Sequence, residues 1–106
     1  FQDGTSTCFR PDMTRTLDPT TLRLFVAVCE EGSLARAAER EALVPSAVSK
    51  RLAALEARLG VPLLVRGRHG VEPTAAGQVL LRQGREVLAA LQRLEVDLDG
   101  FAAGVQ

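Results

Sequence analysis

A stripe of apolar residues near the middle of the chain restricts how it can fold. Four residues along it are spaced by four, three and four positions, which is the spacing of one face of an α-helix. They are Val48, Leu52, Leu55 and Leu59. Pro45 suits the first turn of a helix, and Gly60 suits its end. The sequence therefore predicts a helix over residues 45–59 with one face in a core.

Two helices are predicted before this one. Asp18 followed by a proline is typical of a helix start, since an aspartate cap accepts backbone N–H bonds. Apolar residues at helical spacing then continue until Gly32, where the helix is expected to end. Ser33 is expected to cap a second, short helix that ends near Ala42. The small side chains of the pair Ala37–Ala38 would let another helix approach closely.

A hairpin and a long helix are predicted after Gly60. Residues 62–74 read PLLVRGRHGVEPT, two short apolar stretches around a basic, glycine-rich tip, which indicates a small two-stranded hairpin. Thr74 is expected to cap a long final helix, in which six apolar residues follow a spacing close to a heptad. These six are Leu80, Val87, Leu91, Leu94, Leu98 and Phe101. Three small helices cannot cover so long a stripe, so its distal half is predicted to pair with a partner.

Charge is unevenly distributed along this chain of 106 residues, which is long enough for one small domain. The formal net charge is zero, and bulk charge therefore points to no class of partner. Residues 33–70, however, contain seven basic and three acidic side chains, and the segments on either side each have a net charge of minus two. Any surface that binds anions is therefore expected within this stretch.

The remaining features favour a cytoplasmic protein. Two cysteines, Cys8 and Cys29, are too few for a disulfide framework, and the longest apolar runs fall far short of the roughly 20 residues of a membrane span. The N-terminus also lacks the pattern of a secretion signal. Residues 1–12 are polar and patternless, and they are expected to be a disordered tail or the remnant of a cleaved tag, with Met13 as the natural start.

Three short helices followed by a basic hairpin are the order of a winged helix-turn-helix, whose second motif helix enters the major groove of DNA. A groove about 12 Å wide admits a helix only if its outer side chains are slim. Ser46, Ser49 and Lys50 lie away from the apolar stripe, where they can reach base edges or a phosphate, and Pro45 offers an apolar contact to a thymine methyl. Taken alone, the same pattern is also typical of an ordinary solvent-facing helix.

The run FVAVCEEGSLARAAEREALVPSAVSKRLAALEARLGVPLLVRGRHGVEPTAAG, residues 25–77, resembles the N-terminal DNA-binding domain of LysR-type transcriptional regulators. The resemblance rests on the EEGS turn, the paired alanines, AVS at 47–49, LE at 55–56, LG at 59–60, Arg66 and TAAG at 74–77. It implies a mainly α winged helix-turn-helix domain over residues 13–73 and a linker and dimerisation helix over residues 74–106. It also implies that the chain lacks the effector-binding domain through which such regulators sense a small molecule.

The resemblance also assigns roles to single residues. Pro45, Ser46, Ser49 and Lys50 would meet the major groove, with Arg51 on the DNA backbone. Arg66 and Arg68 would serve the wing, which is the hairpin, and Ser33 would join them at the start of the preceding helix. The final helix would pair with its copy in a second chain, so that a homodimer binds an inverted-repeat operator in double-stranded DNA.

Departures from the family pattern concern base preference more than fold. Many members carry Ser-Gln-Pro where this chain has Val44, Pro45 and Ser46, so the usual serine cap and a glutamine that often reads bases are both replaced. Phenylalanine at the Leu64 position and leucine at the Pro73 position are also common in the family. The identity of the operator is therefore less transferable than the architecture.

Three other interpretations remain open at this point. An enzyme is disfavoured because the chain has one histidine, no glycine-rich phosphate loop and no convergent pair of acids. His69 has no second ligand at metal-binding spacing, and neither a metal nor a cofactor is expected. A protein-interaction module that dimerises through the last helix is the second, and another winged-helix family is the third, although such families usually extend or wrap the hairpin.

Overall fold

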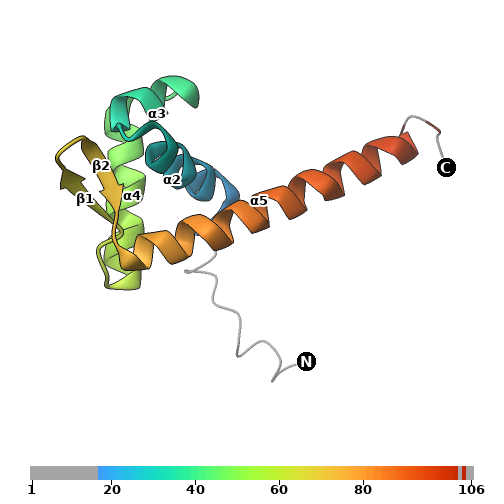
Figure 1. Ribbon diagram of the computed structural model, residues 1–106. Coiled ribbons are helices and arrows are strands. Elements are labelled where there is room, and N and C mark those ends of the chain that lie inside the picture. Colours follow the sequence, from blue (N-terminus) through green and yellow to red (C-terminus); the bar gives the residue numbers. More distant parts are fainter. Residues whose placement is uncertain (1–16, 103, 105–106) are drawn as a thin grey trace.

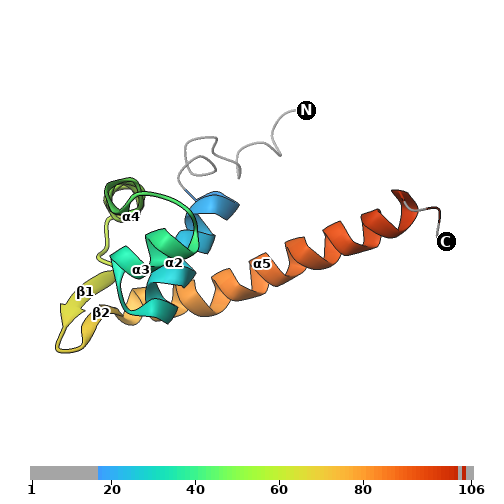
Figure 2. The same ribbon diagram turned by 90° about the horizontal axis from the view of Figure 1, so that it is seen from above.

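The computed structural model describes residues 17–102 and 104. The elements are α2 (Pro19–Glu31), α3 (Leu34–Arg40), α4 (Pro45–Leu59), β1 (Leu64–Gly67), β2 (Gly70–Pro73) and α5 (Ala75–Ala102). Three helices and the hairpin gather at one end, and α5 extends away from them as a long arm (Figures 1 and 2). The predicted winged helix-turn-helix with a long terminal helix is confirmed. The predicted tail over residues 1–12 and the start at Met13 lie outside the described residues.

Local signals set the ends of the helices. The Thr21 amide donates to Asp18 Oδ1 at 2.8 Å, and the Arg36 amide donates to Ser33 Oγ at 3.2 Å, so both predicted caps are present. Gly32 ends α2 with a φ of 69°, in the left-handed region that glycine adopts at little cost. Val44 precedes α4 and supplies no side-chain cap. Pro45 in the first turn compensates in part, because its fixed φ suits a helix start.

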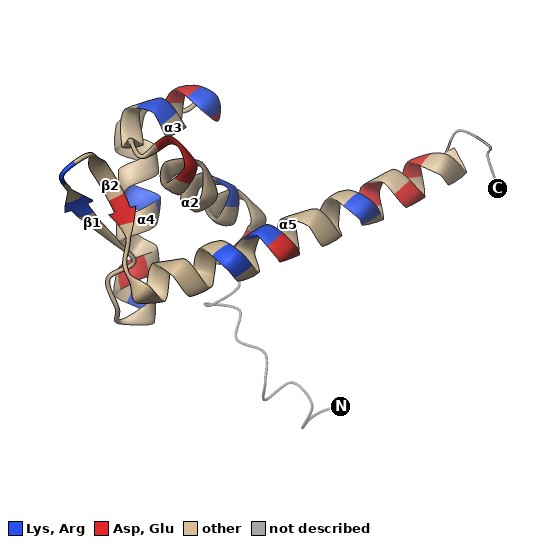
Figure 3. Ribbon diagram, viewed as in Figure 1, with Lys and Arg blue, Asp and Glu red and all other residues tan. Residues whose placement is uncertain are grey.

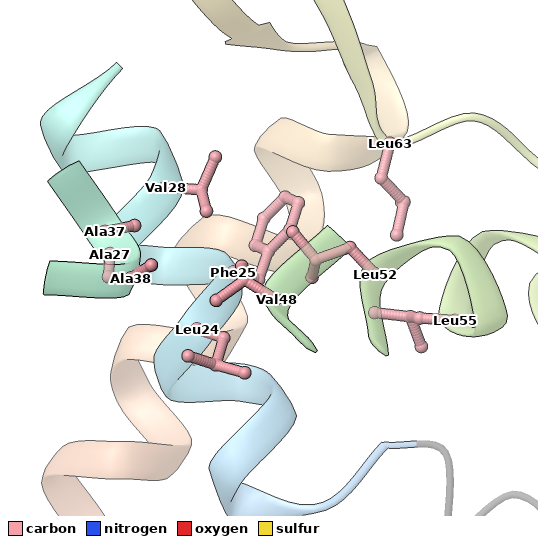
Figure 4. Packing of buried hydrophobic residues seen from close by; sticks show 10 residues of the cluster. All are labelled: Leu24, Phe25, Ala27, Val28, Ala37, Ala38, Val48, Leu52, Leu55 and Leu63. Carbon is pink, nitrogen blue, oxygen red and sulfur yellow. The ribbon is translucent and has the colours of Figure 1, made fainter. Parts of the chain in front are cut away.

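The core forms where α4 lies against α2. Val48, Leu52 and Leu55 are buried as the spacing predicts, and they pack in one cluster with Phe25 of α2. Figure 4 shows the Phe25 ring beside Val48 and Leu52. Each fully buried side chain of this size contributes about 1.5–3 kcal/mol relative to its exposed state. Burial of this stripe fixes which side of α4 faces outward.

The hairpin is attached to the helices through backbone contacts. Its strands pair antiparallel, with Arg66 opposite Val71 and Gly67 opposite Gly70. The Val71 amide donates to the Gly32 carbonyl at 3.0 Å, which joins β2 to the turn between α2 and α3. A Cβ atom at Gly70 would overlap that same carbonyl oxygen, so only glycine permits this approach. The wing therefore lies in a fixed position relative to the helix-turn-helix.

The first half of α5 packs on the core and the second half does not. Thr74 caps the helix as predicted, since its Oγ1 accepts the Gly77 amide at 3.0 Å. Gly77 and Gly84 are buried, and Leu80 packs partly buried against the core. Farther along, the apolar side chains face solvent, and Phe101 is 65 % exposed. In residues 17–102, no helix combines the length and the apolar character needed to cross a bilayer.

Two glycines in α5 are expected to respond in opposite ways to alanine. A Cβ at Gly77 would overlap the Leu63 carbonyl oxygen, a backbone atom that cannot move aside, so Gly77→Ala should destabilise the fold by about 1–3 kcal/mol. Gly100 has open space around it, and Gly100→Ala should stabilise the helix by about 0.5–1 kcal/mol. Urea denaturation of both variants measures this difference. Equal effects of the two substitutions would contradict the tight packing at Gly77.

Candidate nucleic-acid interface

The outer side of α4 is exposed along its first half. Ser46, Ser49 and Lys50 are all exposed, while the stripe on the opposite side of the helix is buried. Small side chains therefore stand on the surface of the helix, with one cation among them. This arrangement agrees with the sequence prediction that a duplex can approach this side without meeting bulky groups.

The structure brings four of the predicted DNA-binding residues together. Ser33, Pro45 and Arg66 line a hollow where the starts of α3 and α4 meet the wing. Ser49 and Arg66 line a second, neighbouring hollow between α4 and β1. Arg66 thus joins the wing to the exposed side of α4, and three elements contribute to one continuous surface.

Arg68 lies apart from this surface, in the exposed turn that joins β1 to β2. Figure 3 shows basic residues at the tip of the hairpin, away from the helices. A cation in this position projects beyond the end of the wing. It suits a contact with the backbone or minor groove at the edge of an interface rather than with the bases that α4 would reach.

Arg51 has partners within the chain. Its guanidinium donates to Thr21 Oγ1 at 3.4 Å and lies 3.8 Å from Asp18 Oδ2, at the start of α2. Burial would raise the pKa of Asp18, but the hydrogen bonds from Thr21 and the charge of Arg51 outweigh it and hold that pKa below its ordinary value. Arg51 therefore faces the α2 terminus, on a different side of α4 from Ser49. Its contact with a DNA backbone stays a prediction.

Ion pairs within the fold reduce the number of basic residues of 33–70 that a partner can reach. Arg40 lies 2.9 Å from Glu30, 3.3 Å from Glu31 and 3.7 Å from Glu41, so its charge is locally balanced. Within residues 33–70, all of which the structure describes, four other basic residues are exposed and have no carboxylate partner within ion-pair distance. They are Arg36, Lys50, Arg66 and Arg68. The basic segment seen in the sequence is thus reduced to a smaller basic surface on α3, α4 and the wing.

Sequence reasoning missed the contact that positions the wing relative to α4. Glu56 Oε2 accepts the amides of Leu63 at 2.7 Å and Leu64 at 3.1 Å, so one carboxylate joins the end of α4 to the start of β1. A signal was present in the sequence, because a carboxylate near the C-terminal end of a helix is disfavoured by the helix dipole unless it has a specific partner. Glu56 also lines the hollow between α4 and β1, so it fixes the wing beside the exposed side of α4.

The Cys29 side chain contributes to the packing of α2. It is half-buried in α2 and packs against the core, where it acts as a small apolar side chain. Burial raises the pKa of its thiol to about 11.

Known proteins resemble this chain in both sequence and fold. The model of the bacterial regulatory helix-turn-helix protein family called lysR matches residues 19–78, which is more than half of the chain. The chain belongs to this LysR family. The transcriptional activator AllS of Salmonella paratyphi A (strain ATCC 9150 / SARB42) is 40 % identical over 89 residues, which are 84 % of this chain and 29 % of AllS. The regulator TcbR of Pseudomonas sp. (strain P51) is 43 % identical over 67 residues, which are 63 % of this chain and 23 % of TcbR.

Solved LysR structures superimpose on the same part of the chain. The DNA-binding domain of CbnR in complex with DNA gives a TM-score of 0.73 at 36 % identity, covering 81 % of this chain and 99 % of that one. The DNA-binding domain of BenM with catB site 1 DNA gives 0.77 at 30 % identity, covering 83 % and 95 %. This LysR-family chain therefore spans a whole DNA-binding domain of that type but less than a third of the length of AllS.

Removing the Glu56 carboxylate from this LysR domain should loosen the wing. Glu56→Ala leaves the Leu63 and Leu64 amides without their acceptor, and each lost hydrogen bond to a charged group costs about 1.5–3 kcal/mol. Hydrogen exchange at these two amides should accelerate strongly, and the melting temperature should fall. Glu56→Gln keeps an acceptor oxygen and should show a smaller change. Unchanged protection of both amides in Glu56→Ala would contradict the anchoring role.

Proposed function

We propose that this chain binds operator DNA as the N-terminal domain of a dimeric LysR-type transcription regulator, with α4 in the major groove. The observation that carries the proposal is the exposed, slim and basic outer side of α4, bordered by Ser33 and Arg66. A helix with a buried stripe on one side and small polar residues on the other meets the steric requirement of the groove.

Base contacts come from the first two turns of α4. The hydroxyls of Ser46 and Ser49 can donate to or accept from base edges, and Lys50 reaches a guanine edge or a phosphate. Pro45, exposed at the start of the helix, offers an apolar surface to a thymine methyl. Because this chain has proline at the position where many relatives have glutamine, its base preference differs from theirs.

Backbone contacts surround this central surface. Arg66 and Arg68 bind phosphates or the minor groove from the wing, and Ser33 binds a phosphate from the start of α3. Arg51 is already paired with Asp18. It contacts the DNA backbone only if its guanidinium binds a phosphate and Asp18 at the same time. These contacts position the domain and carry no sequence information directly.

The distal half of α5 pairs with a second copy of the chain. Four side chains of the predicted stripe are exposed, namely Val87, Leu94 at 53 %, Leu98 at 57 % and Phe101, while Leu91 is half-buried in a groove beside α2. Leu80, which the sequence places on the same stripe, lies against the core of its own chain, so the dimer surface lies mainly beyond it. Two such domains present two recognition helices about one helical turn apart on an inverted repeat.

The relatives support this proposal. CbnR has been solved with its target DNA at full length, where this chain covers 29 % of CbnR. LysG of Corynebacterium glutamicum has been solved with its effector Arg bound. We therefore expect the whole regulator to carry an effector-binding domain after α5, to act in the cytoplasm where bacterial DNA lies, and to have no catalytic activity of its own.

A bulky acid on the outer side of α4 should abolish binding without unfolding the domain. Ser49 is exposed, so Ser49→Glu should leave the melting temperature almost unchanged while repelling the phosphates and filling the groove. Ala54→Glu, at another exposed position farther along α4, is the matched control and should reduce binding much less. Fluorescence anisotropy with operator duplexes measures both. A parallel loss of folding in Ser49→Glu would show that this side of α4 belongs to the core.

Arg66 should contribute through phosphates. Arg66→Ala should weaken binding to all duplexes similarly and flatten the log-log salt dependence by about 0.9 for each phosphate that the Arg66 guanidinium neutralises. Arg23→Ala removes the same charge from α2, where Arg23 already pairs with Glu41, and should change the slope little. A loss confined to one base pair would contradict the phosphate role. If the partner were instead a protein that binds a mostly apolar surface of this chain, the affinity would hardly depend on the salt concentration.

A further inference from the structure

One carboxylate at the end of α2 binds side chains from two other helices, α3 and α5. Glu30, in the last turn of α2, accepts from Arg85 of α5 through Oε2, at 2.9 Å from Nη2 and 3.2 Å from Nε. Its other oxygen, Oε1, lies 2.9 Å from Nη1 of Arg40 in α3. Figure 3 shows the acidic end of α2 beside the basic residues of α3. Glu30 therefore connects the helix-turn-helix to the long arm through charged hydrogen bonds.

Arg85 lies where α5 leaves the rest of the domain. The tight contact of Gly84 with Leu22 of α2 comes one residue earlier. Beyond Arg85, Leu88 and Leu91 line an open groove between α5, α2 and the end of α3, and the following apolar side chains are exposed. The ion pair with Glu30 is thus placed just beyond the close contact at Gly84, where the packing of α5 on α2 opens into a groove.

Stability alone does not explain this arrangement. The side chains of Glu30 and Arg85 are 35 % and 52 % exposed, and exposed ion pairs contribute little to the free energy of folding. Burial would raise the pKa of Glu30, but hydrogen bonds from Arg85 and Arg40 outweigh it and lower that pKa, so the carboxylate stays ionised at neutral pH. What the paired charges restrict is the direction of α5 relative to α2 and α3.

A small change in that direction is amplified along the arm. Phe101 lies sixteen residues beyond Arg85, or about 24 Å at 1.5 Å per residue, so a tilt of about 10° moves it by about 4 Å. This displacement is close to the separation of about 3.4 Å between adjacent phosphates of one DNA strand along the helix axis. A displacement of this size at the dimer contact would shift one recognition helix relative to the other by about one base pair along the DNA.

We propose that Glu30 is a positioning residue that sets the half-site spacing the dimer accepts, by holding α5 at a fixed angle to the helix-turn-helix through Arg85 and Arg40. This inference rests on the proposed function, because it concerns how two DNA-binding units are held apart. Glu30 itself does not touch DNA and determines specificity only through the direction of α5.

The chain supplies a matched control for the test. Glu31 is the neighbouring acid in the same turn of α2 and pairs with the same Arg40 at 3.3 Å, but among the described residues it has no hydrogen bond or ion pair with α5. Glu30→Gln and Glu31→Gln therefore remove the same charge from the same helix end, and only the first removes the ion pair that connects α2 to the arm. Arg85→Gln breaks this connection from the other side and leaves Arg40 paired.

Binding should be measured on a series of inverted-repeat duplexes in which the spacing between half-sites varies by single base pairs, and on a single half-site. We expect Glu30→Gln and Arg85→Gln each to reduce the preference for the best spacing by about threefold, with half-site affinity and melting temperature nearly unchanged. The double variant should show no greater loss than either single one, because both remove one interaction. Glu31→Gln should keep the wild-type preference.

A preference as sharp as wild type in both Glu30→Gln and Arg85→Gln would overturn the inference, and so would an equal loss in Glu31→Gln.

If the wild-type chain bound no duplex, the proposed function would fail, and the direction of α5 would then be measured without DNA. For that purpose, spin labels at His69→Cys and Arg93→Cys, in a Cys8→Ser and Cys29→Ala background diluted with unlabelled chain, report the distance from wing to arm. A distribution that broadens in Glu30→Gln but not in Glu31→Gln supports the positioning role, and an unchanged one refutes it.

Discussion

The packing of α4 against Phe25 determines the rest of this structure. When Val48, Leu52 and Leu55 enter the core, the opposite side of the helix has to face outward, and its residues are small or basic. If α4 turned on its axis, other side chains would face outward. The wing and α5 could not restore the original surface, because both are placed relative to α4 and α2. The apolar half of α4 thus selects which side chains are available to a partner.

Local signals made most of the fold predictable, and long-range polar contacts did not. Caps such as Asp18 and Ser33, helix stops at Gly32 and Gly60, and the periodic leucines act within a few residues of one another. The attachments between elements depend instead on atoms brought together by folding. Glu56 on the wing amides, Arg51 at the start of α2 and Glu30 between two arginines have no periodic pattern that would reveal them.

The same limit applies to the candidate interface. The count of charges located an excess of basic residues in the middle of the chain, but it could not show that two acids of α2 and the residue that follows α3 surround Arg40. The structure separates the cations held within the fold from those on the outer surface. It likewise separates Leu80, which supports its own core, from Leu94 and Leu98, which do not. A single heptad pattern in the sequence thus includes residues in two different environments.

The environment of Cys29 has a consequence for chemistry rather than for folding. With a thiol pKa of about 11, on the order of one molecule in ten thousand carries a thiolate at pH 7, and the thiolate is the form that peroxides and alkylating reagents attack. The helix that carries the core phenylalanine therefore resists oxidative modification at its only sulfur atom. Within residues 17–102, which contain no other cysteine, this leaves the packing of α2 insensitive to mild oxidants.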